Sequence, residues 1–208
     1  KKRSIFNPWV SYSDLYSAIL LTFILITIFF LLKDMMEMQT KAEELEKIAG
    51  IKRSIIEELM KTFKDLQVEF SIDDDTGSII LSNDILFNFN DFKLTEKGKE
   101  IIKFAIPKYI EIILSPDNEK YISSIFIEGS TDPIGDYLYN IDLSMKRAFS
   151  VFSYLKSIEQ IIPYRDIFFK KLICGGKGFN SPIFKPDNTI DFQRSRKVEI
   201  KFSIKDQE

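Results

Sequence analysis

Asp14 is the residue whose type and position most strongly suggest chemistry in this chain. It lies near the start of an apolar run that begins at Trp9 and carries no other charge until Lys33. The run is long enough to cross a bilayer, because a spanning helix needs roughly 20 residues at about 1.5 Å rise each. A carboxylate inside a span costs about 2.5–3.5 kcal/mol on insertion scales, so a simple anchor would gain from an apolar residue there. The sequence therefore predicts that Asp14 binds an ion or a proton, or pairs with a partner helix.

Small and hydroxyl side chains accompany Asp14 if the run is helical. Steps of three and four place Ser17, Ala18 and Thr22 on its face of the helix. One helix cannot enclose an aqueous path, so any ion path along this face needs a partner to supply the other wall. A simpler interpretation also stands, in which Asp14 only caps the start of the helix.

The composition removes several classes of chemistry. The chain has no histidine and one cysteine, Cys174. Ser/His/Asp triads, histidine zinc sites, histidine proton shuttles, intrachain disulfides and multi-cysteine metal sites are therefore excluded. The formal net charge of −2, without a basic stripe, gives no pull toward nucleic acid. No spacing of carboxylates or lysines suggests catalysis, so we expect a protein that is not an enzyme and has no metal site or cofactor.

Charges flanking the apolar run predict its orientation. Three basic residues, 1–3, precede the run, whereas the segment after Lys33 has no positive excess. The positive-inside rule then places residues 1–8 in the cytoplasm, residues 9–32 in the membrane and the remainder on the far side. A cleaved signal peptide is the competing interpretation, but no small-residue cleavage site follows Leu32.

Residues 33–67 have the spacing of a helix that links the membrane to a domain. The segment contains one glycine and no proline. Its apolar residues recur at helical spacing, close to a heptad, at Leu45, Ile48, Ile51, Ile55, Leu59, Phe63 and Leu66. Two interpretations remain open. The helix pairs with its own copy or lies on the membrane as a plug, or it is a spacer that packs on the domain.

Residues 68–208 alternate between strand and helix patterns. A hairpin is predicted over 68–81 around the Asp75-Thr76-Gly77 turn, and Val198–Ile204 alternates as a half-buried strand. The other expected elements are a helix over 95–114 with a possible kink at Pro107, a strand over 121–128, a helix over 143–155 and a short strand over 171–174. This order predicts an α+β domain, with one mixed sheet and helices on one of its faces.

Three blocks of residues 79–204 resemble the peptidoglycan-binding domain of the OmpA/MotB family. The first contains Leu86-Phe87-Asn88-Phe89 and ends at Gly98, and the second runs from Ile127 through Thr131-Asp132 to Leu155. The third joins Gly176 and Gly178 to the basic Arg194–Ile200 stretch. The chain departs from the family pattern at Ser130, where a histidine is usual, and at Ser195, where an asparagine is usual.

The resemblance implies a site for the stem peptide of peptidoglycan. The matching positions are Thr131, Asp132, Asn140, Leu143, Arg147 and Arg196. The carboxylate of Asp132 would hold the ammonium of diaminopimelate, while the guanidinium of Arg147 would hold its carboxylate with two parallel hydrogen bonds. The competing interpretation is that Asp132 caps the following loop and Arg147 is a surface residue of a helix.

The N-terminal segment is similar to the motor branch of the same family. The stretch Pro8–Ala18 resembles the start of the flagellar stator protein MotB, in which the aspartate carries the ion. The resemblance implies that Asp14 carries H⁺ or Na⁺, with Ser17, Ala18 and Thr22 as neighbours in the ion path. It also implies a homodimer, a ring of multi-pass MotA-like subunits around it, and a place in the bacterial inner membrane with the C-terminal domain in the periplasm.

The process that such a motor would drive is less defined by the sequence. Flagellar members usually have a tryptophan in the second block, whereas this chain has Tyr139-Asn140-Ile141-Asp142-Leu143. The N-terminal pattern and the OmpA-like tail are also similar to the stator-like subunit of the Zorya anti-phage defence system. Anti-phage defence, flagellar rotation, gliding and a plain cell-wall tether all remain open.

Overall fold

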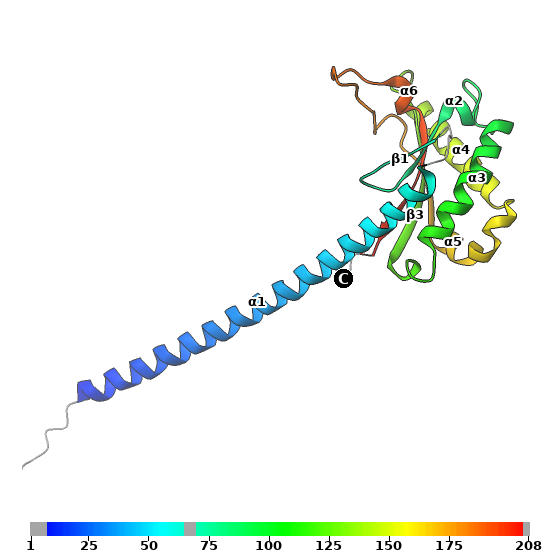
Figure 1. Ribbon diagram of the computed structural model, residues 1–208. Helices are drawn as coiled ribbons and strands as arrows, with labels where there is room; N and C mark the ends of the chain where they lie inside the picture. The colour runs from blue at the N-terminus through cyan, green and yellow to red at the C-terminus, as the bar shows by residue number, and fades with distance from the viewer. Residues whose placement is uncertain (1–7, 65–69, 206–208) are drawn as a thin grey trace, which may run out of the picture. The chain divides into compact units, whose positions relative to one another are not determined.

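The structure, a computed structural model, describes residues 8–64 and 70–205, with side chains from Tyr12 onward. The chain divides into two compact units, the first ending at Ala49 and the second beginning at Gly50. The first unit contains most of one long helix, and the second contains a sheet with its covering helices (Figure 1). The three basic residues at the start of the chain and Val68 of the expected hairpin lie outside the described residues.

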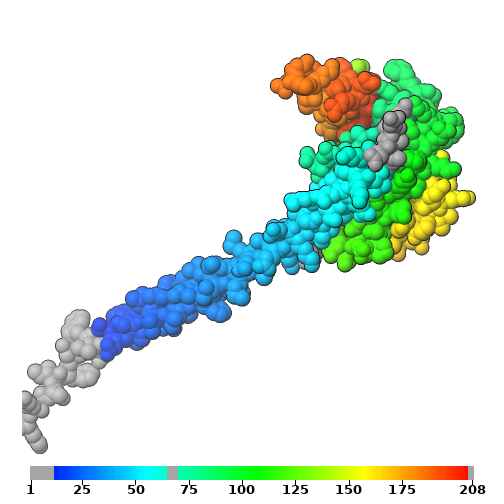
Figure 2. Space-filling view, in the orientation of Figure 1, coloured from blue at the N-terminus to red at the C-terminus, as the bar shows by residue number. Residues whose placement is uncertain are grey.

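The long helix α1 runs without interruption from Pro8 to Phe63. It is the one helix among the described residues that is long and apolar enough to cross a membrane. Every side chain from Tyr12 to Lys47 is exposed (Figure 2). The part of this exposed surface from Leu15 to Leu32 is mostly apolar, and such a surface is stable only when lipid or another protein covers it.

Five strands form one mixed sheet in the order β1-β2-β5-β3-β4. Their bounds are β1 (Phe70–Ile72), β2 (Ile79–Ser82), β3 (Ile122–Ser130), β4 (Leu172–Gly176) and β5 (Lys197–Ile204). Only β3 and β4 pair in parallel, and the other neighbours are antiparallel. The expected hairpin is confirmed, because β1 pairs with β2 across a turn that contains Gly77 at a φ of 71°.

The helices cover one face of this sheet, which confirms the predicted α+β class (Figure 1). The helical elements of the domain are α2 (Asn83–Leu86), α3 (Glu96–Ile113), α4 (Tyr137–Leu155), α5 (Arg165–Lys171), α6 (Phe192–Ser195) and the 3₁₀ turns η1 (Glu119–Tyr121) and η2 (Glu159–Tyr164). On β5 the residues Val198, Ile200 and Phe202 are buried, whereas the residues between them are half-buried and charged or polar. The alternation gives the sheet one apolar face and one polar face.

The last turns of α1 belong to the core of the domain. Ile55, Leu59 and Phe63 are buried with the apolar residues of the sheet and of α3. The Phe63 and Phe70 rings also meet edge to face, with centroids 5.3 Å apart. This end of the helix therefore packs on the domain, as the spacer interpretation expected, whereas Leu45 stays 64% exposed.

Pro107 does not divide the helix in which it lies. α3 runs from Glu96 to Ile113 as one element, and Thr95 caps its start by accepting a hydrogen bond from the Gly98 backbone amide at 2.9 Å. The helix of the second sequence block, α4, begins at Tyr137, so it is longer than the predicted helix over 143–155. Asp136 caps that start by accepting bonds from the Leu138 and Tyr139 backbone amides.

The helix α4 approaches the sheet closely at two glycines. A Cβ atom at Gly129 would collide with the Ser144 backbone carbonyl, and one at Gly176 would collide with the Met145 backbone amide. No flexible side chain can yield at either contact, since the opposing atoms are backbone. The absence of a side chain at these positions lets α4 lie directly over the ends of β3 and β4.

We expect Gly129→Ala to lower the free energy of unfolding by about 3 kcal/mol, the upper end of the usual cost of overpacking. Gly175→Ala is the matched control, because a Cβ there would meet no atom within 4 Å. That variant should stay within about 0.5 kcal/mol of the wild type. Urea unfolding of the full chain in detergent, monitored by circular dichroism, measures the free energy of unfolding of both variants. Equal stability of the two variants would contradict the packing argument.

Candidate ligand-binding pocket

The register of the sheet brings three chain segments together at one end of its strands. Ser82 at the end of β2 and Ser130 at the end of β3 both lie opposite Lys197, the first residue of β5. The residues just beyond these positions must therefore meet at the same end of the strands. They are Asn83 and Asp84 on α2, Thr131 and Asp132 after β3, and Arg196 before β5.

Asn83 fixes these segments to one another. Its side-chain amide donates to the Ser130 carbonyl at 2.9 Å, and its backbone amide donates to the Arg196 carbonyl at 3.1 Å. Asn83 is only 2% exposed. The three segments at this end of the strands are thus joined by hydrogen bonds before any ligand arrives, which is the condition for a preorganised site.

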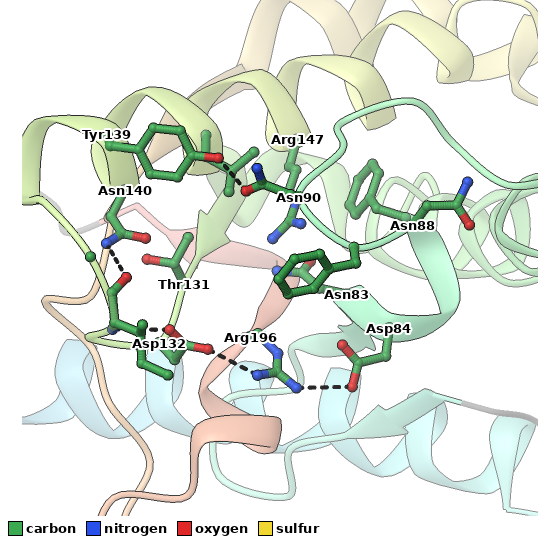
Figure 3. Close-up of a pocket in the computed structure, with 15 residues that line it drawn as sticks. Asn83, Asp84, Asn88, Asn90, Thr131, Asp132, Tyr139, Asn140, Arg147 and Arg196 are labelled. Atoms are coloured by element: carbon green, nitrogen blue, oxygen red, sulfur yellow. Dashed lines mark hydrogen bonds and ion pairs between the residues drawn. The ribbon is translucent and has the colours of Figure 1, made fainter.

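A pocket of about 680 Å³ opens at this end of the strands (Figure 3). Its lining comes from α2, the loop after it, the loop after β3, α4 and the start of β5. The lining residues are Asn83, Asp84, Phe87, Asn88, Phe89, Asn90, Thr131, Asp132, Ile134, Gly135, Tyr139, Asn140, Leu143, Arg147 and Arg196. This volume is in the range of pockets that hold small organic ligands.

Arg196 joins two carboxylates across the pocket. Its Nη1 lies 2.9 Å from Asp132 Oδ2, and its Nη2 lies 3.2 Å from Asp84 Oδ2. The hydrogen bond with Asp132, together with Asp84, raises the pKa of Arg196 above its usual value even though partial burial acts in the opposite direction. The second oxygen of Asp132 accepts from the Ile134 backbone amide at 3.0 Å, so this carboxylate is held at both ends.

Arg147 reaches the pocket from α4 and is not a surface residue. It is 6% exposed, its Nε donates to the Asp91 carbonyl at 2.9 Å, and its guanidinium lies 5.3 Å from the centre of the Phe87 ring. Burial lowers the pKa of Arg147. With its Nε used by the backbone, the outer nitrogens of the guanidinium are left for a ligand, and two outer nitrogens suit a carboxylate.

The pocket carries balanced charge. Two carboxylates, Asp84 and Asp132, face two guanidinium groups, Arg147 and Arg196. Figure 3 shows Arg196 between the two acids, with Arg147 on the other side of the pocket. Separated groups of both signs complement a zwitterion, such as the amino-acid end of a peptide, better than they complement a simple anion or cation.

All six residues predicted for the ligand site line this one pocket. Asn140 closes the loop after β3, because its side-chain amide donates to the carbonyls of Ile134 and Asp136. Leu143 lies one turn further along α4. The buried Thr131 Oγ1 has no hydrogen-bond partner among the described residues, so it is available to a ligand.

Sequence reasoning missed two features of this pocket. Asp84 was not predicted, although it stands two residues after the end of β2 and just before the first motif block. The partner of Asp132 was missed as well, since that carboxylate pairs with Arg196 and not with Arg147. A polar pair that directly follows a predicted strand was the signal for Asn83 and Asp84.

Asp14, the predicted ion site, lies in the other unit, well inside α1. The helix begins at Pro8, so the interpretation of Asp14 as a cap at the helix start is wrong. Its side chain is exposed and has no hydrogen bond or ion pair with any described residue. On the same face, the Thr22 hydroxyl donates to the Ala18 carbonyl, a bond that satisfies a hydroxyl within an apolar helix.

Comparison with known proteins assigns the family. The model of the OmpA family matches residues 86–196, which is more than half of the chain. All six predicted ligand residues lie in this range, and Arg196 is its last position. The chain belongs to the OmpA family. Outer membrane protein A of Citrobacter freundii, for example, is 33% identical over 121 residues, which cover 58% of this chain and 44% of that protein.

Other relatives match this OmpA-family chain over nearly its whole length. The Zorya protein ZorB of Escherichia coli O139:H28 (strain E24377A) is 28% identical over 212 residues, covering 95% of this chain and 82% of that protein. A Zorya protein ZorB of Escherichia coli strain ATCC 8739 is 27% identical over 220 residues, covering 97% and 89%. These similarities extend through the apolar segment of α1, beyond the OmpA domain.

The fold also matches a solved structure of a MotB-like protein. A crystal structure of a MotB-like protein from Desulfovibrio vulgaris aligns with a TM-score of 0.56 and 18% identity. The alignment covers 78% of this chain and 96% of that one. At this identity the comparison establishes the fold alone, and it agrees with the OmpA-like domain that was predicted from the three sequence blocks.

Proposed function

We propose that this chain is the ion-carrying, cell-wall-anchored subunit of a stator-type rotary motor in the bacterial inner membrane, and that the motor serves anti-phage defence. The observation that carries the proposal is the similarity to Zorya ZorB proteins over 95% and 97% of the chain. An outer-membrane relative matches only 58% of it. Similarity that includes both α1 and the OmpA domain favours a common architecture over a shared binding domain alone.

The pocket supports the anchoring part of the proposal. Its ligand is the zwitterionic end of the peptidoglycan stem peptide. The ammonium group lies against the carboxylate of Asp132, which Arg196 holds in place, and the carboxylate lies against the outer nitrogens of Arg147. The OmpA domain would then lie in the periplasm, with α1 crossing the inner membrane and the N-terminus in the cytoplasm.

The exposed apolar segment of α1 supports the motor part. Asp14 makes no bond within the described chain, and its neighbours Ser17 and Ala18 are small and exposed. Two copies of the helix inside a ring of multi-pass subunits would cover this surface and complete an aqueous path for H⁺ or Na⁺. Binding and release of the ion at Asp14 would change its charge and thus its contacts with the ring. The wall anchor supplies the fixed reference that torque requires.

The assembly is tested by purifying the tagged full chain, expressed with its neighbouring genes, in a mild detergent. Native mass spectrometry should find two copies of this chain together with several copies of one multi-pass membrane protein. Recovery of the chain alone, as a monomer, would contradict the stator proposal.

The same gene neighbourhood distinguishes the process that the motor drives. A nuclease or helicase gene beside the partner supports defence, and flagellar genes support the alternative of a flagellar stator.

A further inference from the structure

A second cavity opens on the face of the sheet opposite the covering helices. Lys197 of β5 belongs to this face, because its neighbour Val198 is buried in the core on the other. Ser82 of β2 lies opposite Lys197 in the ladder and belongs to the same face. The cavity has a volume of about 350 Å³ and shares only Arg196 with the pocket described above. It is therefore a separate candidate site.

The polar side chains that line this cavity include no carboxylate. They are Ser71, Ser82, Gln193, Arg194, Arg196 and Lys197. Lys197 pairs with Glu199 at 3.0 Å, and Arg196 pairs with the two acids of the other pocket, but none of these acids lines this cavity. Walls that offer several N–H and O–H donors and no carboxylate suit an anion with several acceptor oxygens.

Arg194 is the cation of this cavity that is left for a ligand. Its backbone amide donates to the Asp191 carboxylate at 3.0 Å, which fixes the chain at this point. Its guanidinium is exposed and makes no hydrogen bond or ion pair with any residue that the structure describes. The Ser82 hydroxyl is also unused, because it makes no capping bond to α2. A ligand can bind these donors without breaking a bond of the protein.

One wall of the cavity is fastened by a residue that departs from the family pattern. Ser195, where an asparagine is usual, is fully buried, and its hydroxyl accepts from the Ile183 backbone amide at 2.9 Å. The Asp191 backbone amide donates to the Ile183 carbonyl at 2.7 Å. Both bonds hold Ile183 beside α6, the helix that carries Gln193 and Arg194. The wall is thus formed before a ligand arrives.

The rest of the lining is apolar and comes from Phe70, Ile80 and Ile183. The volume of about 350 Å³ lies at the lower end of the range for small organic ligands, and a bare inorganic anion would leave most of it unfilled. A ligand that fits both parts of the lining has an anionic group for the donors and a small organic body for the apolar side chains.

We propose that this cavity binds a small organic phosphate, with Arg194 and Lys197 as the cations that contact its phosphate group. The planar guanidinium of Arg194 matches two phosphate oxygens, and the ammonium of Lys197 acts as a compact charge. A phosphorylated metabolite and a phospholipid headgroup share this chemistry. The proposal goes beyond the wall-anchored motor and does not depend on it, because the two cavities have separate walls apart from Arg196.

Isothermal titration calorimetry of the full chain in a non-ionic detergent tests the site. The probes are glycerol 3-phosphate, the short-chain lipid dihexanoyl-phosphatidylglycerol, and glycerol as the uncharged control. The wild type should bind a phosphate probe and not glycerol. Arg194→Gln should weaken that binding about tenfold or more, because it removes hydrogen bonds to a charged group. Tighter binding of the lipid assigns the site to a headgroup, and equal or tighter binding of glycerol 3-phosphate assigns it to a soluble organic phosphate.

Lys185→Gln is the matched control, since it removes the same charge from the same segment before β5, and Lys185 is exposed but does not line the cavity. It should bind the phosphate probe like the wild type. Failure of the wild type to bind either phosphate probe would overturn the site, and so would unchanged binding by Arg194→Gln or equal weakening by both variants.

Co-sedimentation with sacculi separates this site from the peptidoglycan pocket. Arg194 does not line that pocket, so Arg194→Gln should sediment with sacculi like the wild type. Loss of sedimentation by this folded variant would assign Arg194 to the peptidoglycan pocket and overturn the separate site. If the wild type itself did not bind sacculi, the anchoring function would fail, while binding of the phosphate probe would still support the second cavity.

Discussion

Asp14→Asn is expected to abolish phage protection, or any other output of the motor, while the chain stays in the membrane and assembles normally. Asparagine has nearly the shape of aspartate, so it preserves packing against a partner ring. It cannot carry a negative charge or exchange a proton, so it cannot bind and release an ion. The loss should be complete, because no other acid lies in the apolar run between residues 9 and 32.

Asp34→Asn is the matched control for this variant. It makes the same change in the same helix, just outside the apolar run. Plating efficiency of phage measures the output, and membrane fractionation with native gel electrophoresis measures insertion and assembly. Full protection by Asp14→Asn, or equal loss by both variants, would remove the ion-carrying role of Asp14.

Asp132→Ala and Arg147→Ala are each expected to weaken binding of the full chain to purified sacculi by about 30-fold or more. Both groups are buried and charged, and truncating one member of such a contact typically costs 2–5 kcal/mol. Removal of Asp132 leaves Arg196 paired with Asp84 alone, which pulls the guanidinium toward α2 and away from the ligand. Removal of Arg147 eliminates the outer nitrogens and also the bond that holds the Asp91 carbonyl.

Asp142→Ala and Lys146→Ala provide matched controls on α4, because these two residues form an exposed ion pair that does not line the pocket. Exposed pairs contribute little to stability, so both variants should fold and bind like the wild type. Co-sedimentation with sacculi measures binding, and thermal unfolding establishes that each variant is folded. Equal sedimentation of the pocket variants and the controls would contradict the assignment of the ligand.

The sequence predicted the α+β fold from local patterns, and the resemblance to the OmpA/MotB family implied six of the residues that line the pocket. Alternation along β5 and the motif after β3 are visible residue by residue, and Thr131, Asp132, Arg147 and Arg196 all line one cavity. The pairing inside that cavity was not predictable in the same way. Whether Asp132 meets Arg147 or Arg196 depends on the register of β5 with β3, which spans 64 residues of chain.

The apolar stripe after the membrane segment illustrates a second limit. Leu45, Ile55 and Leu59 follow the same helical spacing, so their pattern could indicate pairing with a second copy or packing on the domain. The structure separates them, because Ile55 and Leu59 are buried in the domain core while Leu45 is exposed. Only the position of the helix relative to the sheet decides this, and spacing carries no such information.

Ion flux through the assembled complex tests the central proposal most directly. The complex of this chain with its multi-pass partner is reconstituted into liposomes, a membrane potential is imposed, and H⁺ and Na⁺ entry are followed with fluorescent indicators. The proposal predicts flux of one of these ions with the wild type and background flux with Asp14→Asn. Equal flux in the two preparations, or background flux of both ions with the wild type, would contradict it.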